Sequence, residues 1–153
     1  MTKIFAHRGA SAYAPENTME AFHLAAKQGA DGIELDVHVT KDGEVVVTHD
    51  EKIDRVSNGS GFVKDMTLRE LKRLSFHNHM ESYVGAGIPT LREVLEFVKT
   101  TTMAVNIELK TGLYWYPNIE EKTVALVHEL GMQDRIIYSS FNHHSIAKLK
   151  EID

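Results

Sequence analysis

The stretch IFAHRGASAYAPENT, residues 4–18, joins a short apolar run to the start of a helix. Its first three residues predict a short strand, which is followed at once by the imidazole of His7 and the guanidinium of Arg8. Asn17 and Glu20 stand at the spacing of a capping box, so a helix is expected to start there. Because α/β folds place their chemistry at the carboxyl ends of strands, His7 and Arg8 are candidate functional residues.

The rest of the chain continues this order of strands and helices. Apolar or alternating runs predict strands at residues 4–6, 33–40, 45–48, 103–110 and 136–139. Helices are expected after Asn17, Thr67, Thr90, Asn118 and Asn142, and the Thr-Leu-Arg-Glu tetrapeptides at Thr67 and Thr90 each match a capping box. The largely alternating order favours an α/β fold.

The connection between the second and third strands leaves their pairing open. The short turn at residues 41–43 favours a hairpin, whereas a parallel pair normally needs a crossover of roughly a dozen residues or more. In a hairpin, Asp36 would lie near Thr48. In a parallel pair, Asp36 and His49 would both lie near the carboxyl ends of their strands. Either arrangement brings the acidic residues and His49 close together.

Two predicted strands carry charged residues where apolar ones are expected. Glu34 and Asp36 share one face of the second strand, and Glu108 and Lys110 share one face of the fourth. Burying unpaired carboxylates is costly, so a hard divalent cation held by oxygen ligands would explain all three acids. The alternative is an ordinary solvated sheet face. His38 shares the face of Glu34 and Asp36, and its role stays open.

Composition narrows the class of protein. The 153 residues carry a formal net charge of −5, and acidic and basic residues are interspersed. We therefore expect no nucleic-acid partner, since no basic stripe is present. The chain has no cysteine, no secretory leader before its first strand and no apolar run long enough for membrane insertion. These features predict a cytoplasmic protein.

Six segments of the chain form a recognisable set, and they span essentially all of it. They are AHRGASAYAPENT (6–18), GADGIELDVHVTKDGEVVVTHD (29–50), DRVSNGSGFVKDMTLREL (54–71), IPTLREVLEF (88–97), NIELK (106–110) and SSFN (139–142). His-Arg-Gly alone would be weak, but its combination with Pro-Glu-Asn-Thr, Glu-x-Asp and His-Asp at this spacing is highly specific. Together the six segments resemble the glycerophosphodiester phosphodiesterase family.

The resemblance implies a (β/α)₈ TIM barrel with a small insertion after the third strand, here about residues 51–87. A complete barrel typically has about 250 residues. Residues 1–153 would therefore form one partial barrel domain of about five strands, with strands 6–8 absent from this chain. The open edges of such a barrel would permit self-association.

The family hydrolyses glycerophosphodiesters to glycerol 3-phosphate and an alcohol, and the resemblance carries residue roles with it. Glu34, Asp36 and Glu108 are the implied metal ligands for Mg²⁺ or Ca²⁺, with Mn²⁺ as a further candidate. His7 and His49 are the implied acid–base pair. The implied substrate contacts are Arg8, Lys110 and Glu16, although Glu16 could instead cap the helix. Ser139, Ser140 and Phe141 match a strand end that lines the pocket.

Two interpretations of the chain follow. The first is a metal-dependent phosphodiesterase that acts on small soluble glycerophosphodiesters by His/His acid–base catalysis, with water or a substrate hydroxyl as the nucleophile. The second is a non-catalytic truncated fragment that retains only metal or phosphate binding. The retained motif residues favour the first for the parent protein, and the missing strands favour the second for this chain.

Overall fold

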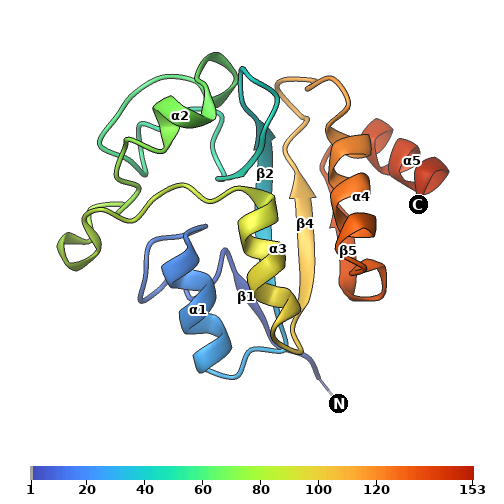
Figure 1. Cartoon of the computed structure of the whole chain (residues 1–153), viewed down its shortest axis with the longest axis horizontal. Helices are drawn as coiled ribbons and strands as arrows, with labels where there is room; N and C mark the ends of the chain where they lie inside the picture. The colour runs from blue at the N-terminus through green and yellow to red at the C-terminus, as the bar shows by residue number, and fades with distance from the viewer. Residues whose placement is uncertain (1) are drawn as a thin grey trace.

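The computed structural model describes residues 2–153, in which five strands and five α-helices follow one another along the chain (Figure 1). The strands are β1 (Phe5–His7), β2 (Gly32–Val39), β3 (Val45–Val47), β4 (Ala104–Leu109) and β5 (Ile136–Ser139). The α-helices are α1 (Met19–Lys27), α2 (Leu68–Leu71), α3 (Leu91–Lys99), α4 (Ile119–Glu129) and α5 (His143–Ile152). Short 3₁₀ turns are η1 (Val63–Asp65), η2 (Glu81–Tyr83) and η3 (Gln133–Arg135).

The five strands form one sheet, but only four of them run parallel. The parallel order is β1-β2-β4-β5, while β3 pairs antiparallel with the second half of β2. Val37 lies opposite Val47, and the Thr48 amide donates to the Asp36 carbonyl oxygen over 3.0 Å. The hairpin alternative is therefore the one that forms, because the turn after β2 is too short for a crossover.

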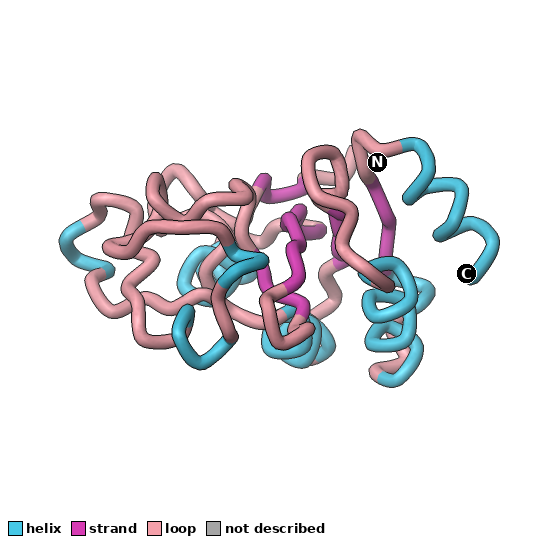
Figure 2. Tube along the Cα trace, turned by 90° about the horizontal axis from the view of Figure 1, so that it is seen from above, coloured by secondary structure: helices cyan, strands magenta, loops and turns pink. Residues whose placement is uncertain are grey.

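The helices cover one face of the parallel strands. Helix α3 lies in front of β2 and helix α4 in front of β5 in Figure 1, and Figure 2 shows most helices gathered along one side of the strands. Helix α3 buries four side chains at helical spacing against the sheet, namely Leu91, Val94, Leu95 and Val98. Burying each such side chain contributes roughly 1.5–3 kcal/mol, so packing fixes this helix. The predicted capping boxes at Thr67 and Thr90 are both confirmed.

The start of α1 differs from the prediction. Thr18 is the N-cap, and its hydroxyl accepts a hydrogen bond from the Ala21 amide. Asn17 lies one residue earlier with φ of 56°, in the left-handed region, and its side chain turns toward the sheet. The predicted capping role of Asn17 is wrong, because the threonine next to it satisfies the helix terminus instead.

The segment between β3 and α3 packs on a smaller core of its own. This second core joins Val46 of β3 to buried residues of the loop and α2, namely Ile53, Val56, Val63, Leu71, Phe76 and Ile88. The segment occupies the left side of the molecule in Figures 1 and 2. It stands beside the carboxyl ends of the parallel strands, where the predicted site residues also lie.

None of the helices in residues 2–153 has the length and apolar composition that crossing a bilayer demands.

Candidate metal centre and its surroundings

Strand register brings the three predicted acidic ligands together. Asp36 on β2 lies directly opposite Glu108 on β4, and Glu34 stands two residues before Asp36 on the same face. Glu34, Asp36 and Glu108, here called the acidic cluster, each offer a carboxylate oxygen, and these oxygens all lie within 4.8 Å of one another. The apolar residues that alternate with the acids on β2, Ile33, Leu35 and Val37, are fully buried on the opposite face. The alternating pattern thus reflects a helix-covered face and an acidic face, as predicted.

The electrostatics of the acidic cluster fit a bound cation. Glu34 Oε1 and Asp36 Oδ1 are buried and have no hydrogen-bond partner. Burial, together with the neighbouring charges of Asp36 and Glu108, raises the pKa of Glu34 to about 7. Burial also raises the pKa of Asp36. Carboxylate oxygens are the ligands that hard divalent cations prefer, so the acidic cluster could hold a metal ion.

Arg8 is held beside the acidic cluster by an unusual backbone conformation. Its φ is 58°, and its amide donates to both the carbonyl oxygen and the Oε2 of Glu34, over 3.0 and 3.1 Å. The Arg8 guanidinium lies 3.5 Å from Asp36 Oδ2. Gly9 follows with φ of 78°, and a Cβ there would approach Ala21 to 2.8 Å. The His-Arg-Gly sequence is therefore required to turn the chain tightly against α1 and to aim Arg8 inward.

Lys110 and the two histidines surround the same acidic cluster. Lys110 Nζ lies 3.0 Å from Glu108 Oε1, 3.3 Å from His49 Nε2 and 3.9 Å from Asp36 Oδ1. His7 Nε2 lies 3.7 Å from Glu34 Oε2, and 69% of its side chain is exposed. His7, Arg8 and Lys110 therefore contact the acidic cluster directly, and His49 lies beside it next to Lys110.

Glu16 contacts a cation on each side and caps no helix. Its carboxylate accepts from Arg8 Nη1 over 3.1 Å and from two nitrogens of Arg55 over 2.7 and 3.0 Å. Burial alone would raise the pKa of Glu16, but hydrogen bonds and charges from Arg55 and Arg8 outweigh it and lower the pKa. Arg55 could not be predicted from the sequence, because it lies in an irregular loop with no periodic pattern.

Two further buried polar residues that sequence reasoning did not place support the site. Asn17 Nδ2 donates to Asp36 Oδ2 over 2.9 Å, which its position inside Pro-Glu-Asn-Thr could have suggested. His38 is fully buried and donates from Nε2 to the His49 carbonyl oxygen over 2.9 Å, so its Nδ1 accepts from the Tyr116 hydroxyl over 2.7 Å. Burial lowers the pKa of His38 to about 4, which keeps this histidine neutral.

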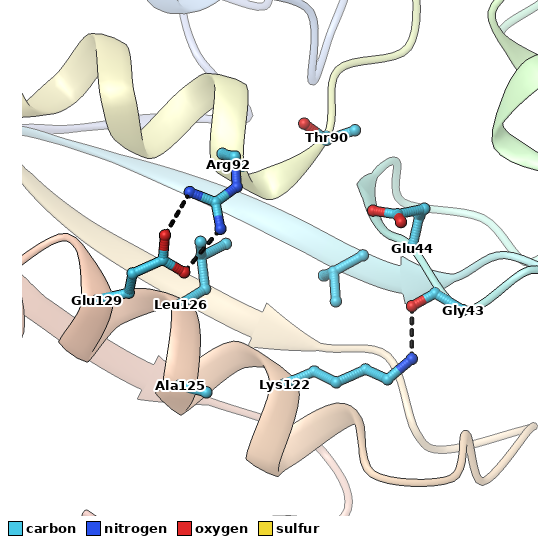
Figure 3. Close-up of a pocket in the computed structure, with 9 residues that line it drawn as sticks. Gly43, Glu44, Thr90, Arg92, Lys122, Ala125, Leu126 and Glu129 are labelled. Atoms are coloured by element: carbon cyan, nitrogen blue, oxygen red, sulfur yellow. Dashed lines mark hydrogen bonds and ion pairs between the residues drawn. The ribbon is translucent and has the colours of Figure 1, made fainter.

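A surface groove elsewhere on the molecule carries none of the predicted site residues. This groove of about 310 Å³ lies between α3, α4 and the β2–β3 turn (Figure 3). Its two basic groups are already paired, Arg92 with both oxygens of Glu129 and Lys122 with the Gly43 carbonyl oxygen. A smaller cavity of about 90 Å³ lies beside Glu108 and Lys110, and Phe141 lines its rim. The second cavity belongs to the candidate centre.

Related proteins of known sequence share almost the whole of this chain. It is 50% identical over 152 residues to a glycerophosphodiester phosphodiesterase of Caldanaerobacter subterraneus, covering 99% of this chain and 63% of the relative. It is 51% identical over 149 residues to one from Bacillus altitudinis, covering 96% and 61%. The chain thus spans about three fifths of the length of these relatives.

Solved structures agree with the sequence relatives. A glycerophosphodiester phosphodiesterase from Agrobacterium tumefaciens superposes with a TM-score of 0.90 at 42% identity, covering 99% of this chain and 63% of the other. An Oleispira antarctica phosphodiesterase, solved with the product sn-glycerol-3-phosphate, gives a TM-score of 0.84 at 34% identity, covering 99% and 62%. These matches confirm the expected α/β fold as a partial TIM barrel. Residues 7–153 also match the glycerophosphoryl diester phosphodiesterase family, and the chain belongs to that family.

Proposed function

We propose that this chain supplies the catalytic part of a metal-dependent hydrolase that cleaves glycerophosphodiesters to glycerol 3-phosphate and an alcohol. One observation carries the proposal. Three carboxylates converge to within 4.8 Å, with two buried oxygens lacking any partner, beside two imidazoles and two cationic side chains. The family membership and the product-bound Oleispira antarctica relative support the choice of substrate class.

Arg8 and Lys110 are the proposed phosphate contacts. Both reach the acidic cluster, and their positive charges would bind the non-bridging oxygens of a phosphodiester. Glu34, Asp36 and Glu108 would hold Mg²⁺, Ca²⁺ or Mn²⁺, which supplies electrostatic stabilisation of the negative charge that develops on the phosphoryl oxygens. Arg8, whose guanidinium donates in a planar fork, orients the phosphate as well as attracting it.

His7 and His49 are the proposed proton-transfer groups. His7 contacts the acidic cluster from β1, and His49 lies beside Lys110 in the segment after β3, so each imidazole could serve a different oxygen of a bound phosphodiester. One imidazole accepts the proton of the attacking hydroxyl or water, and the other donates a proton to the leaving alcohol. Imidazole suits this exchange because it gains and loses protons near neutral pH.

A second candidate function is metal or phosphate binding without turnover. The observation that favours it is the length of the chain, which covers 61–63% of the relatives named above. Every proposed ligand and proton-transfer group lies within that part. However, β1 and β5 are the edge strands of the parallel sheet and do not pair with each other, so the sheet does not close into a barrel.

Release of glycerol 3-phosphate from glycerophosphocholine separates the two functions. We expect turnover by the 153-residue chain in Mg²⁺ or Ca²⁺ that EDTA abolishes. We also expect His7→Ala and His49→Ala each to reduce kcat by about 10²–10⁴-fold, the usual contribution of an acid or base. Folded wild-type protein that binds the metal without turnover would favour the binding function.

A further inference from the structure

Arg55 joins two carboxylates that border the candidate centre. It lies in the loop after β3 and makes four hydrogen bonds, here called the Arg55 fork. Two go to Glu16, over 2.7 and 3.0 Å, and two go to Asp50, over 2.9 and 3.1 Å. Each carboxylate accepts two parallel N–H groups of the guanidinium. Such bidentate pairs fix the relative orientation of the two side chains.

The loop holds Arg55 firmly even though 45% of its side chain is exposed. Ile53 and Val56 flank it in the chain and are buried in the second core. Asp54 accepts a hydrogen bond from the Gly61 amide over 3.0 Å, which closes the loop. The guanidinium is therefore presented from anchored backbone, a requirement for orienting other side chains.

On one side, the Arg55 fork competes with Arg8 for Glu16. Glu16 Oε1 accepts from both guanidinium groups, over 3.1 Å from Arg8 and 2.7 Å from Arg55. If Arg55 were absent, Glu16 would be free to pair fully with Arg8. That pairing would draw the Arg8 guanidinium from its place 3.5 Å from Asp36.

On the other side, the Arg55 fork fixes the carboxylate that faces His49. Asp50 Oδ1 lies 2.7 Å from His49 Nδ1, and a carboxylate can only accept, so Nδ1 carries the proton. This leaves His49 Nε2 directed at Lys110, 3.3 Å away. A carboxylate that selects one imidazole tautomer in this way orients the ring for proton transfer.

We propose that Arg55 is a positioning residue, which sets the orientation of Arg8 through Glu16 and the tautomer of His49 through Asp50. The effect of Arg55 on turnover rests on the proposed function. The effect of Arg55 on the His49 tautomer does not depend on that function. Partly exposed ion pairs contribute only modestly to stability, so we expect the main consequence of the Arg55 fork to be the orientation of its partners.

The tautomer of His49 tests this role without any need for turnover. We would record ¹⁵N imidazole spectra of the 153-residue chain with Mg²⁺ at mildly alkaline pH, and identify the His49 signals by their loss in His49→Gln. Wild type should show the Nδ1–H form. Arg55→Gln and Arg55→Lys should gain the Nε2–H form, because neither side chain can hold both carboxylates. Asp50→Ala should do the same.

Arg92→Gln is the matched control, since Arg92 is 46% exposed and forms a similar two-bonded pair with Glu129 far from the centre. It should leave the His49 signals unchanged. A wild-type His49 pattern in both Arg55 variants would overturn the proposal, whatever Asp50→Ala does.

Turnover provides the second readout. Arg55→Gln and Arg55→Lys should lower kcat for glycerophosphocholine about tenfold, the usual cost of losing an outer positioning contact, while Arg92→Gln stays at the wild-type value. Wild-type kcat in Arg55→Lys would contradict the role. If wild type releases no glycerol 3-phosphate, the proposed function fails, and the His49 spectra still decide the role of Arg55.

Discussion

Asp36 and Glu108 face each other across the parallel strands β2 and β4, with Glu34 one step away on the same face. Register alone thus gathers three carboxylates, whose mutual repulsion the two neighbouring cationic groups of Arg8 and Lys110 offset only in part. The arrangement lowers the stability of the metal-free protein and favours metal binding.

Metal should stabilise the fold through Glu34. Binding at a hundred times the dissociation constant adds about 2.7 kcal/mol to the free energy of unfolding, or roughly 5–10 °C in Tm for a chain of this size. Glu34→Gln should abolish this Mg²⁺-dependent rise in thermal melts. Its metal-free Tm should equal or exceed that of wild type, because a buried carboxylate oxygen without a partner is replaced. Glu20→Gln, an exposed change on α1, should keep the full response.

Asn17 should act on metal affinity by holding Asp36. Asn17→Gly keeps the left-handed backbone, whose φ is 56°, and removes only the amide that donates to Asp36. We expect about a tenfold weaker Mn²⁺ affinity by calorimetry. Asn17→Ala should show the same loss and also unfold more easily than Asn17→Gly, by about 1 kcal/mol, because alanine disfavours that backbone. Unchanged affinity in both variants would rule out this role.

The sequence predicts the acidic cluster because strand alternation places residues two apart on one face. It also predicts the strands and the capping boxes at Thr67 and Thr90, and the family resemblance assigns His7, Arg8, His49 and Lys110 to the same site. It could not choose between the β2–β3 pairings, since turn length and the parallel order of the fold favour opposite answers. Arg55 was beyond reach for a different reason: its partners, Asp50 and Glu16, lie five and 39 residues away.

Asp50 should make stability depend on pH in the acid range. Hydrogen bonds from Arg55 lower the pKa of Asp50 from 3.8 to about 2. Burial opposes this shift, and the hydrogen bond from His49 adds to it. A lowered folded-state pKa means that the stabilisation is complete above the unfolded value and is lost as pH falls from about 4 toward 2. Because Asp50 and Arg55 are both partly exposed, solvent screens the pair and we expect a contribution of about 1 kcal/mol or less.

Urea unfolding of wild type and Asp50→Asn at a series of pH values measures the contribution of the Asp50 charge to the free energy of unfolding. The variant should be less stable at neutral pH, and the two should converge as pH approaches 2, since the other carboxyl groups titrate alike in both. A gap that stays constant with pH would show that Asp50 stabilises the fold by some route other than its charge.

His38 and Tyr116 should contribute to stability through buried hydrogen bonds. Tyr116→Phe leaves His38 Nδ1 without its donor and should cost about 1 kcal/mol in the free energy of unfolding. His38→Leu also leaves the His49 carbonyl unpaired and should cost about 2 kcal/mol or more. Tyr13→Phe, at an exposed site, is the control and should have no effect. Equal stability of all three variants would refute the account of this buried pair.

Titration of the 153-residue chain with Mn²⁺, followed by calorimetry and by the electron paramagnetic resonance of free Mn²⁺, tests the acidic cluster most directly. We predict one saturable site per chain, displaced by Mg²⁺ or Ca²⁺, and lost in Glu34→Gln, Asp36→Asn and Glu108→Gln while each variant remains folded. Absence of saturable binding in wild type, or undiminished binding in the three variants, would contradict a shared metal centre.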